Sequence, residues 1–185
     1  MEKGCFQYQI VLFGDYTDIS FTQDNVAKMM TIFSKYNLLV NTFNEVDVKT
    51  GNTIQRVRLV SINDPIEIRF GLSRIDILMH SKDYYGTNLN SLEDFITTSK
   101  KYIEQIQQEY NKDFNRVSLV SDFFYEDENR DNYDYIYRKI RVPFGSFKDS
   151  VPIEWSITDV NRVKEIINGN CEEINLAAIF SRYKG

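Results

Sequence analysis

A run of carboxylates and amides between two aromatic clusters contains the residue types that could do chemistry. Residues 126–132 read EDENRDN. Asp127, Asn129 and Asp131 stand where a calcium loop of the EF-hand type places its first three oxygen ligands. The last ligand of such a loop is a bidentate Glu, but Arg138 occupies that position. The spacing therefore disfavours an EF-hand loop, and we expect neither a metal ion nor another cofactor.

Two enzyme classes can be compared with the sequence. Asp122, Glu126 and Asp127 are clustered carboxylates that could serve a metal-dependent hydrolase, which stays an alternative. The chain contains one histidine, His80, and no G-x-S-x-G or phosphate-loop motif. We therefore predict no catalytic residues and favour a protein that is not an enzyme.

A second alternative is a binder of single-stranded nucleic acid. Aromatic rings that stack on bases, next to cations that hold phosphates, are typical of such proteins. A strand over 133–143 would place four suitable side chains on one face: Tyr135, Tyr137, Lys139 and Arg141. The formal net charge of −5 makes nucleic acid an unfavourable partner.

The acidic charge and the 25 Phe and Tyr residues (13 and 12) favour a protein–protein interaction module. We expect a basic protein partner and an inhibitory or regulatory role, which suits a phage or mobile-element origin. Homo-oligomers are compatible with this interpretation. The predicted interaction surface joins an acidic hairpin tip to tyrosines that follow it: Glu126, Asp127, Glu128, Asp131, Tyr133, Tyr135 and Tyr137.

The cysteine content and the apolar segments bear on the protein's surroundings. Cys5 and Cys171 are the only cysteines, too few for a disulfide framework or a zinc site. No apolar run approaches the length that spans a bilayer, and the N-terminal residues do not resemble a signal peptide. We expect a cytoplasmic protein that does not bind membranes.

The hydrophobic periodicity predicts an α+β fold: an antiparallel meander sheet with two main helices packed on one face, in a single domain over 1–185. The first strand carries Phe6, Tyr8 and Ile10 on one face. The first helix follows at 20–38, capped by Thr22 or Ser20, and its apolar face carries Val26, Met29, Met30 and Phe33. The second helix spans 91–110, with Ser91 as its N-cap. Two strands meet at 50–52, and strands 116–125 and 133–143 are expected to form a hairpin around the acidic run.

The segment 65–80 predicts one hairpin in full register. Pairing Phe70 with Ile75 sets Arg69 opposite Asp76 and Ile66 opposite Met79. Apolar pairs then share one face, whereas a shift by one residue would break this match.

The segment 159–183 is open between two structures. Val160, Val163 and Ile167 have helical spacing behind an Asp159 cap. The same residues could instead form a hairpin, with Val163 opposite Ile174 and Lys164 opposite Glu173. Two stretches, PIEWSITDVNRVKEIINGNCEEIN and NRVSLV, resemble a sporadically distributed group of uncharacterised bacterial proteins. This resemblance implies no activity and no site residues.

Overall fold

The computed structural model describes most of the chain. The described residues are 2–83, 86, 88–126, 134, 135, 137–139, 154–167 and 169–182. Contacts divide the chain into two compact units, Met1–Glu126 and Asp127–Gly185. Each unit is described by itself, and the single domain over 1–185 stays a prediction.

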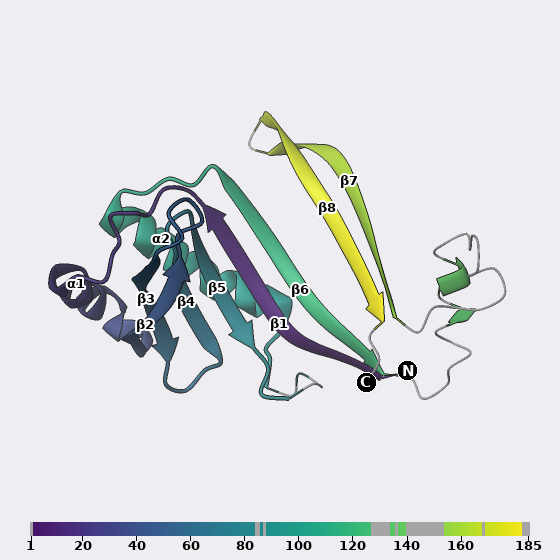
Figure 1. Cartoon of the computed structure of the whole chain (residues 1–185), viewed down its shortest axis with the longest axis horizontal. Coiled ribbons are helices and arrows are strands. Elements are labelled where there is room, and N and C mark those ends of the chain that lie inside the picture. The colour runs from purple at the N-terminus through teal and green to yellow at the C-terminus, as the bar shows by residue number, and fades with distance from the viewer. Residues whose placement is uncertain are drawn as a thin grey trace. The chain divides into compact units, whose positions relative to one another are not determined.

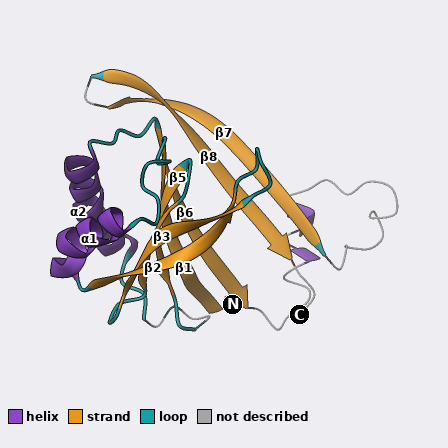
Figure 2. Cartoon of the chain, turned by 60° about the vertical axis from the view of Figure 1, so that its left-hand side comes forward, coloured by secondary structure: helices purple, strands orange, loops and turns teal. Residues whose placement is uncertain are grey.

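The first unit contains a six-stranded antiparallel sheet with the strand order β2-β3-β4-β5-β1-β6. Its helices lie on one face of this sheet (Figure 1, Figure 2). The predicted fold class, α+β with an antiparallel sheet, is therefore confirmed. The strands are β1 (Glu2–Phe13), β2 (Leu38–Val46), β3 (Thr53–Ser61), β4 (Ile66–Phe70), β5 (Arg74–His80) and β6 (Arg116–Glu126), and the helices are α1 (Gln23–Phe33), the short 3-10 helix η1 (Ser34–Tyr36) and α2 (Leu92–Tyr110).

The β4–β5 hairpin has the predicted register. Phe70 pairs with Ile75, Arg69 with Asp76 and Ile66 with Met79. The apolar members of these pairs are buried in the core beneath the helices, and the charged pair lies on the opposite face. Alternation of apolar and polar residues was enough to predict this register because only one face of β4 packs on the helices.

A β-bulge near the start of β1 changes which residues face the core. The pairing with β6 shifts between Cys5 and Gln7, so Phe6 is left over and its ring is exposed. Cys5 packs against the core in its place. The prediction that Phe6 shares the face of Tyr8 and Ile10 is therefore wrong, because a bulge reverses the alternation of the strand.

The first helix has one of its two predicted N-caps and buries part of its predicted apolar face. The Thr22 side chain accepts a hydrogen bond from the backbone nitrogen of Asn25 and caps α1. Met29 and Phe33 are buried in the core, but Met30 is exposed and Ile32 is buried. The apolar face of α1 is thus rotated relative to the predicted one.

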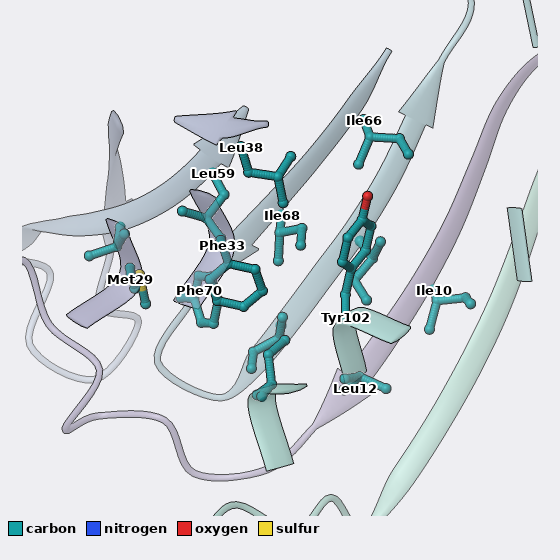
Figure 3. Packing of buried hydrophobic residues seen from close by; sticks show 14 of the residues in the cluster. Ile10, Leu12, Met29, Phe33, Leu38, Leu59, Ile66, Ile68, Phe70 and Tyr102 are labelled. Atoms are coloured by element: carbon teal, nitrogen blue, oxygen red, sulfur yellow. The ribbon is translucent and has the colours of Figure 1, made fainter. Parts of the chain in front are cut away.

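The second helix covers the centre of the sheet. Ser91 caps α2 by accepting a hydrogen bond from the backbone nitrogen of Asp94. The Phe95 ring stacks on Tyr8 of β1 with 5.6 Å between the ring centroids. Figure 3 shows Tyr102 of α2 with labelled residues of the strands. The core contains residues from both helices and from five strands.

The second unit contains a two-stranded antiparallel sheet of β7 (Trp155–Ile167) and β8 (Asn170–Arg182). Val163 pairs with Ile174 and Lys164 with Glu173, so the hairpin alternative for this segment holds. Residues 134, 135 and 137–139 are helical. The predicted strand over 133–143 is therefore wrong at these residues.

Candidate functional site

Most of the predicted acidic tip lies outside the described residues. The residues of the tip outside the described part are Asp127, Glu128 and Asp131. Two other predicted site residues also lie outside it: Tyr133 of the interaction surface and Arg141 of the nucleic-acid patch. Glu126 ends β6, where its backbone pairs with Glu2 of β1. An electrostatic contact through this run stays a prediction.

Tyr135 and Tyr137, the described tyrosines of the predicted interaction surface, differ in exposure. Tyr135 is exposed, and the Lys139 ammonium lies 5.4 Å from the centroid of its ring. Tyr137 is only 2 % exposed, and its ring lies 5.5 Å from that of Trp155. Side chains two residues apart share a face in a strand but point in nearly opposite directions in a helix. Tyr137 is therefore buried, while the predicted interaction surface as a whole stays a prediction.

Of the three carboxylates of the hydrolase alternative, Asp127 lies outside the described residues, and only the backbone of Glu126 is described. Asp122 lies opposite Gln7 and accepts a hydrogen bond from the Gln7 amide at 3.3 Å. Glu126 is four residues further along the same strand, so the Cα atoms of Asp122 and Glu126 are about 13 Å apart. Among the described residues, no three His, Cys, Asp or Glu side chains form a group that could hold a metal ion.

The face of the sheet away from the helices, here called the outer face, carries an ion network. Glu67 accepts hydrogen bonds from Arg69 at 2.8 and 3.0 Å and from Arg58 at 3.4 Å. Burial opposes ionisation of Glu67, but the hydrogen bonds and charges of the two arginines outweigh it and lower the pKa. One carboxylate thus accepts from two arginines, and the buried Nε atom of Arg58 has no hydrogen-bond partner among the described residues.

The only histidine lies at the edge of this network. Burial and the positive charge of Arg69 lower the pKa of His80, while Glu67 partly opposes this. Neither Cys5 nor Cys171 forms a disulfide. Next to the network, the buried Asp76 carboxylate is held by Arg74 at 3.0 Å and by Gln9 at 2.8 Å. These groups are arranged to satisfy one another, which indicates a structural role for the outer face.

A different feature stands out at the edge of the sheet. β6 is the last strand in the order, so no strand of the described chain pairs with its outward side. Val117, Leu119 and Phe123 are 51 %, 48 % and 43 % exposed. They lie on the helix-side face, in register with Leu12, Ile10 and Cys5 of β1. The strand is eleven residues long and thus presents a continuous edge with apolar side chains.

The opposite edge of the sheet differs in its chemistry. β2 forms that edge, and its middle carries Asn41, Thr42, Asn44 and Glu45. Polar and charged residues on an edge strand oppose pairing with another chain. β2 also exposes two large apolar side chains near its ends, Leu39 and Val46, so the two edges differ mainly in the residues at their middle.

The sequence of this strand indicates which of its faces are apolar but not whether its edge is paired. The run RVSLVSDFFYE places apolar residues at both alternate sets of positions, as is typical of a strand covered on both faces. We predicted a pairing of this strand with 133–143, which assigned its second edge to a partner within the chain. Residues 134, 135 and 137–139 of that segment are helical, so the predicted strand pairing does not form at these residues.

Comparison with known proteins returned no match, whether to protein-family models, to curated proteins or to solved structures. Neither helix of the described part of the chain is both long and apolar enough to cross a bilayer.

Proposed function

We propose that the protein is a non-enzymatic protein-interaction module that binds its partner by adding a strand to β6. The observation that carries this proposal is the outward edge of β6, with which no strand of the described residues pairs, together with the half-exposed side chains of Val117 and Leu119. Strand addition supplies backbone hydrogen bonds along the whole edge, and the side chains on alternate positions supply selectivity.

The charges around β6 define the chemistry of the partner. The strand ends at Glu126, directly before the acidic residues of 127–131. A partner strand that lies beside this end meets negative charge, which favours a basic residue in that strand. If the partner needs the bound surface for its own function, binding to β6 would inhibit or regulate that function.

The two alternatives gain no support from the described residues. The Cα atoms of Asp122 and Glu126 lie about 13 Å apart along β6, and Asp127 is outside the described residues. In the predicted nucleic-acid patch, Tyr137 is buried, and Tyr135 is exposed with the Lys139 ammonium near its ring. Arg141 lies outside the described residues.

Co-capture with an edge variant tests the proposal. Leu119→Lys places a charge in the middle of β6, and Asn44→Lys places the same charge on β2 as a matched control. Tagged wild-type protein and both variants are incubated with an extract of the native host. We expect Asn44→Lys to capture the same proteins as the wild type and Leu119→Lys to lose them. The three proteins should have equal melting temperatures. Identical capture by all three proteins would refute an interaction through β6.

A further inference from the structure

We infer that the β7–β8 hairpin joins a second copy of the chain through the outward edge of β8, in an antiparallel dimer with two-fold symmetry. The inference goes beyond the proposed function, because it concerns the second unit and does not involve β6. The dimer turns two hairpins into one four-stranded sheet with the strand order β7-β8-β8-β7.

The described hairpin has only two strands, which is rarely enough for a stable sheet. A two-stranded hairpin is marginally stable in water, whereas three or more strands with an apolar face form a stable sheet. β7 and β8 are thirteen residues long each, and no other strand of the described residues pairs with either of them. A second copy of the hairpin supplies the missing strands.

One face of the hairpin carries most of its large apolar side chains. Residues paired across two antiparallel strands share a face, which assigns six of them to it. At the base of this face, the Tyr137 ring lies 5.5 Å from that of Trp155. Nearer the turn, Phe180 and Leu176 are 46 % and 53 % exposed, so the apolar face continues beyond the part on which Tyr137 packs. The six residues are Trp155, Ile157, Val163, Ile174, Leu176 and Phe180.

The two edges of the hairpin differ in charge. Residues 174–181 of β8 read INLAAIFS and contain no charged side chain. Charges on an edge strand oppose pairing with another chain, whereas an uncharged run without Pro or Gly favours pairing with an identical run. β8 is therefore the edge for a second copy, and two chains of net charge −5 do not repel each other along this run. The charges of β7 lie along its length at Asp159, Arg162, Lys164 and Glu165, and those of β8 flank the run at Glu172, Glu173 and Arg182.

One register matches the uncharged run with itself. A two-fold interface uses the same surface on both copies, so the residue on the axis lies opposite its own copy. With Ala177 on the axis, Ile174 lies opposite Phe180 twice on the apolar face, and residues 172–182 all have partners. An antiparallel pair of this length makes about ten backbone hydrogen bonds, as many as a typical protein interface.

The neighbouring registers fit less well. With Leu176 on the axis, the acidic Glu172 lies opposite Phe180. With Ala178 on the axis, the paired stretch of β8 shrinks to 174–182. The register centred on Ala177 is therefore the one that pairs a long stretch without setting a charge opposite an apolar ring.

A charge on the axis tests the dimer. Ala177→Lys sets two ammonium groups opposite each other, and Ala177→Glu sets two carboxylates opposite each other. Each variant should raise the dimer dissociation constant about 10-fold, because like charges in direct opposition repel. An equimolar mixture of the two variants should form dimers again, since Lys then lies opposite Glu. Sedimentation equilibrium of the native chain, both variants and the mixture measures these effects.

Val160→Lys is the matched control for the axis variants. Val160 pairs with Ala177 within the hairpin and shares its face, but it belongs to β7. Both side chains are exposed, so the far-UV circular dichroism of the variants should match that of the native chain. The control should stay a dimer. A monomeric native chain, equal weakening by Val160→Lys and Ala177→Lys, or a mixture that stays monomeric would overturn the inference.

Disulfide crosslinking tests the register. Two cysteine variants are made in a Cys171→Ser background, which removes the exposed native thiol of β8. Ala177→Cys places two thiols on the axis with their Cα atoms about 5 Å apart, within reach of a disulfide. Ser181→Cys is the control on the same strand and face, because the two copies of residue 181 are about 27 Å apart in the dimer. We expect a covalent dimer with Ala177→Cys only, and equal crosslinking of both variants, or none, would contradict the inference.

The dimer and the interaction through β6 can fail separately. Leu119→Lys should stay a dimer, and Ala177→Lys should still capture the partner of β6. If Leu119→Lys abolishes self-association, the second copy binds β6 and the dimer through β8 is wrong. If the native chain is a monomer while Leu119→Lys loses captured proteins, the dimer fails and the interaction module stands.

Discussion

The Nη2 atom of Arg56 lies 2.6 Å from the carbonyl oxygen of Tyr16. Arg56 is 1 % exposed, and its guanidinium donates hydrogen bonds only to backbone oxygens. Burial lowers the pKa of Arg56, and the Glu45 carboxylate at 3.7 Å partly offsets this. The side chain thereby joins β3 to the loop after β1 and to the β4–β5 turn. Its acceptors are the carbonyls of Tyr16, Thr17, Phe70 and Gly71.

Replacement of this buried arginine should destabilise the first unit strongly. Arg56→Lys keeps the charge but loses the planar fork, which leaves several buried carbonyls without donors. We expect a loss of about 3 kcal/mol or more in the free energy of unfolding, measured by urea denaturation. Arg58→Lys is the control, because its side chain is 33 % exposed, and should cost less than about 1 kcal/mol. Similar losses in both variants would show that the carbonyl contacts of Arg56 contribute little.

Residues on the apolar face of α2 should contribute unequally to the free energy of unfolding. Phe95 is fully buried and stacks on Tyr8, so Phe95→Ala should cost about 3–5 kcal/mol. Ile103 is only partly buried against the core, so Ile103→Ala should cost about 1–2 kcal/mol. Denaturant melts measure both values. A cost below about 1 kcal/mol for Phe95→Ala would indicate that α2 is not packed on the sheet.

Two glycines with the same backbone conformation should respond differently to a methyl group. Gly86 and Gly51 have φ angles of +74° and +72°. A Cβ atom at Gly86 would overlap the carbonyl oxygen of Cys5, whereas one at Gly51 has open space around it. Gly51→Ala should therefore cost about 1 kcal/mol, the strain of the backbone alone. Gly86→Ala should cost about 3 kcal/mol or more. Equal shifts of the unfolding midpoint would mean that the backbone of Cys5 moves aside freely.

The stability of the first unit should fall at alkaline pH in part because of Tyr110. Burial, with the charges of Glu109 and Asp18, raises the pKa of Tyr110 to about 12. The unfolded chain loses this proton near pH 10, so stability falls as the pH rises from 10 to about 12. Tyr110→Phe should flatten this fall and change stability at pH 7 by less than about 1 kcal/mol. Urea midpoints at pH 7, 10 and 11 measure the effect, with Tyr135→Phe, an exposed ring, as the control. An unchanged slope would show that other groups dominate the alkaline loss.

Local features were predictable from the sequence alone. The register of β4–β5 followed from alternation and charge pairs, and the caps Thr22 and Ser91 followed from their place before apolar periodicity. The β7–β8 hairpin was one of two alternatives with the correct pairing of Val163 and Ile174. In each case the interacting residues lie within about twenty positions of one another, so contacts that are local in sequence determine these features.

Features that depend on distant segments were decided only by the tertiary structure. The bulge at Phe6 arises where β1 meets β6, more than a hundred residues later in the chain. The burial of Arg56 requires three segments to meet around one side chain. The candidate site followed the same rule, since Tyr137 packs against Trp155 and residues 134, 135 and 137–139, expected to form a strand beside β6, are helical. A strand's sequence encodes which faces are apolar, but whether its edge is paired depends on which other segment reaches it.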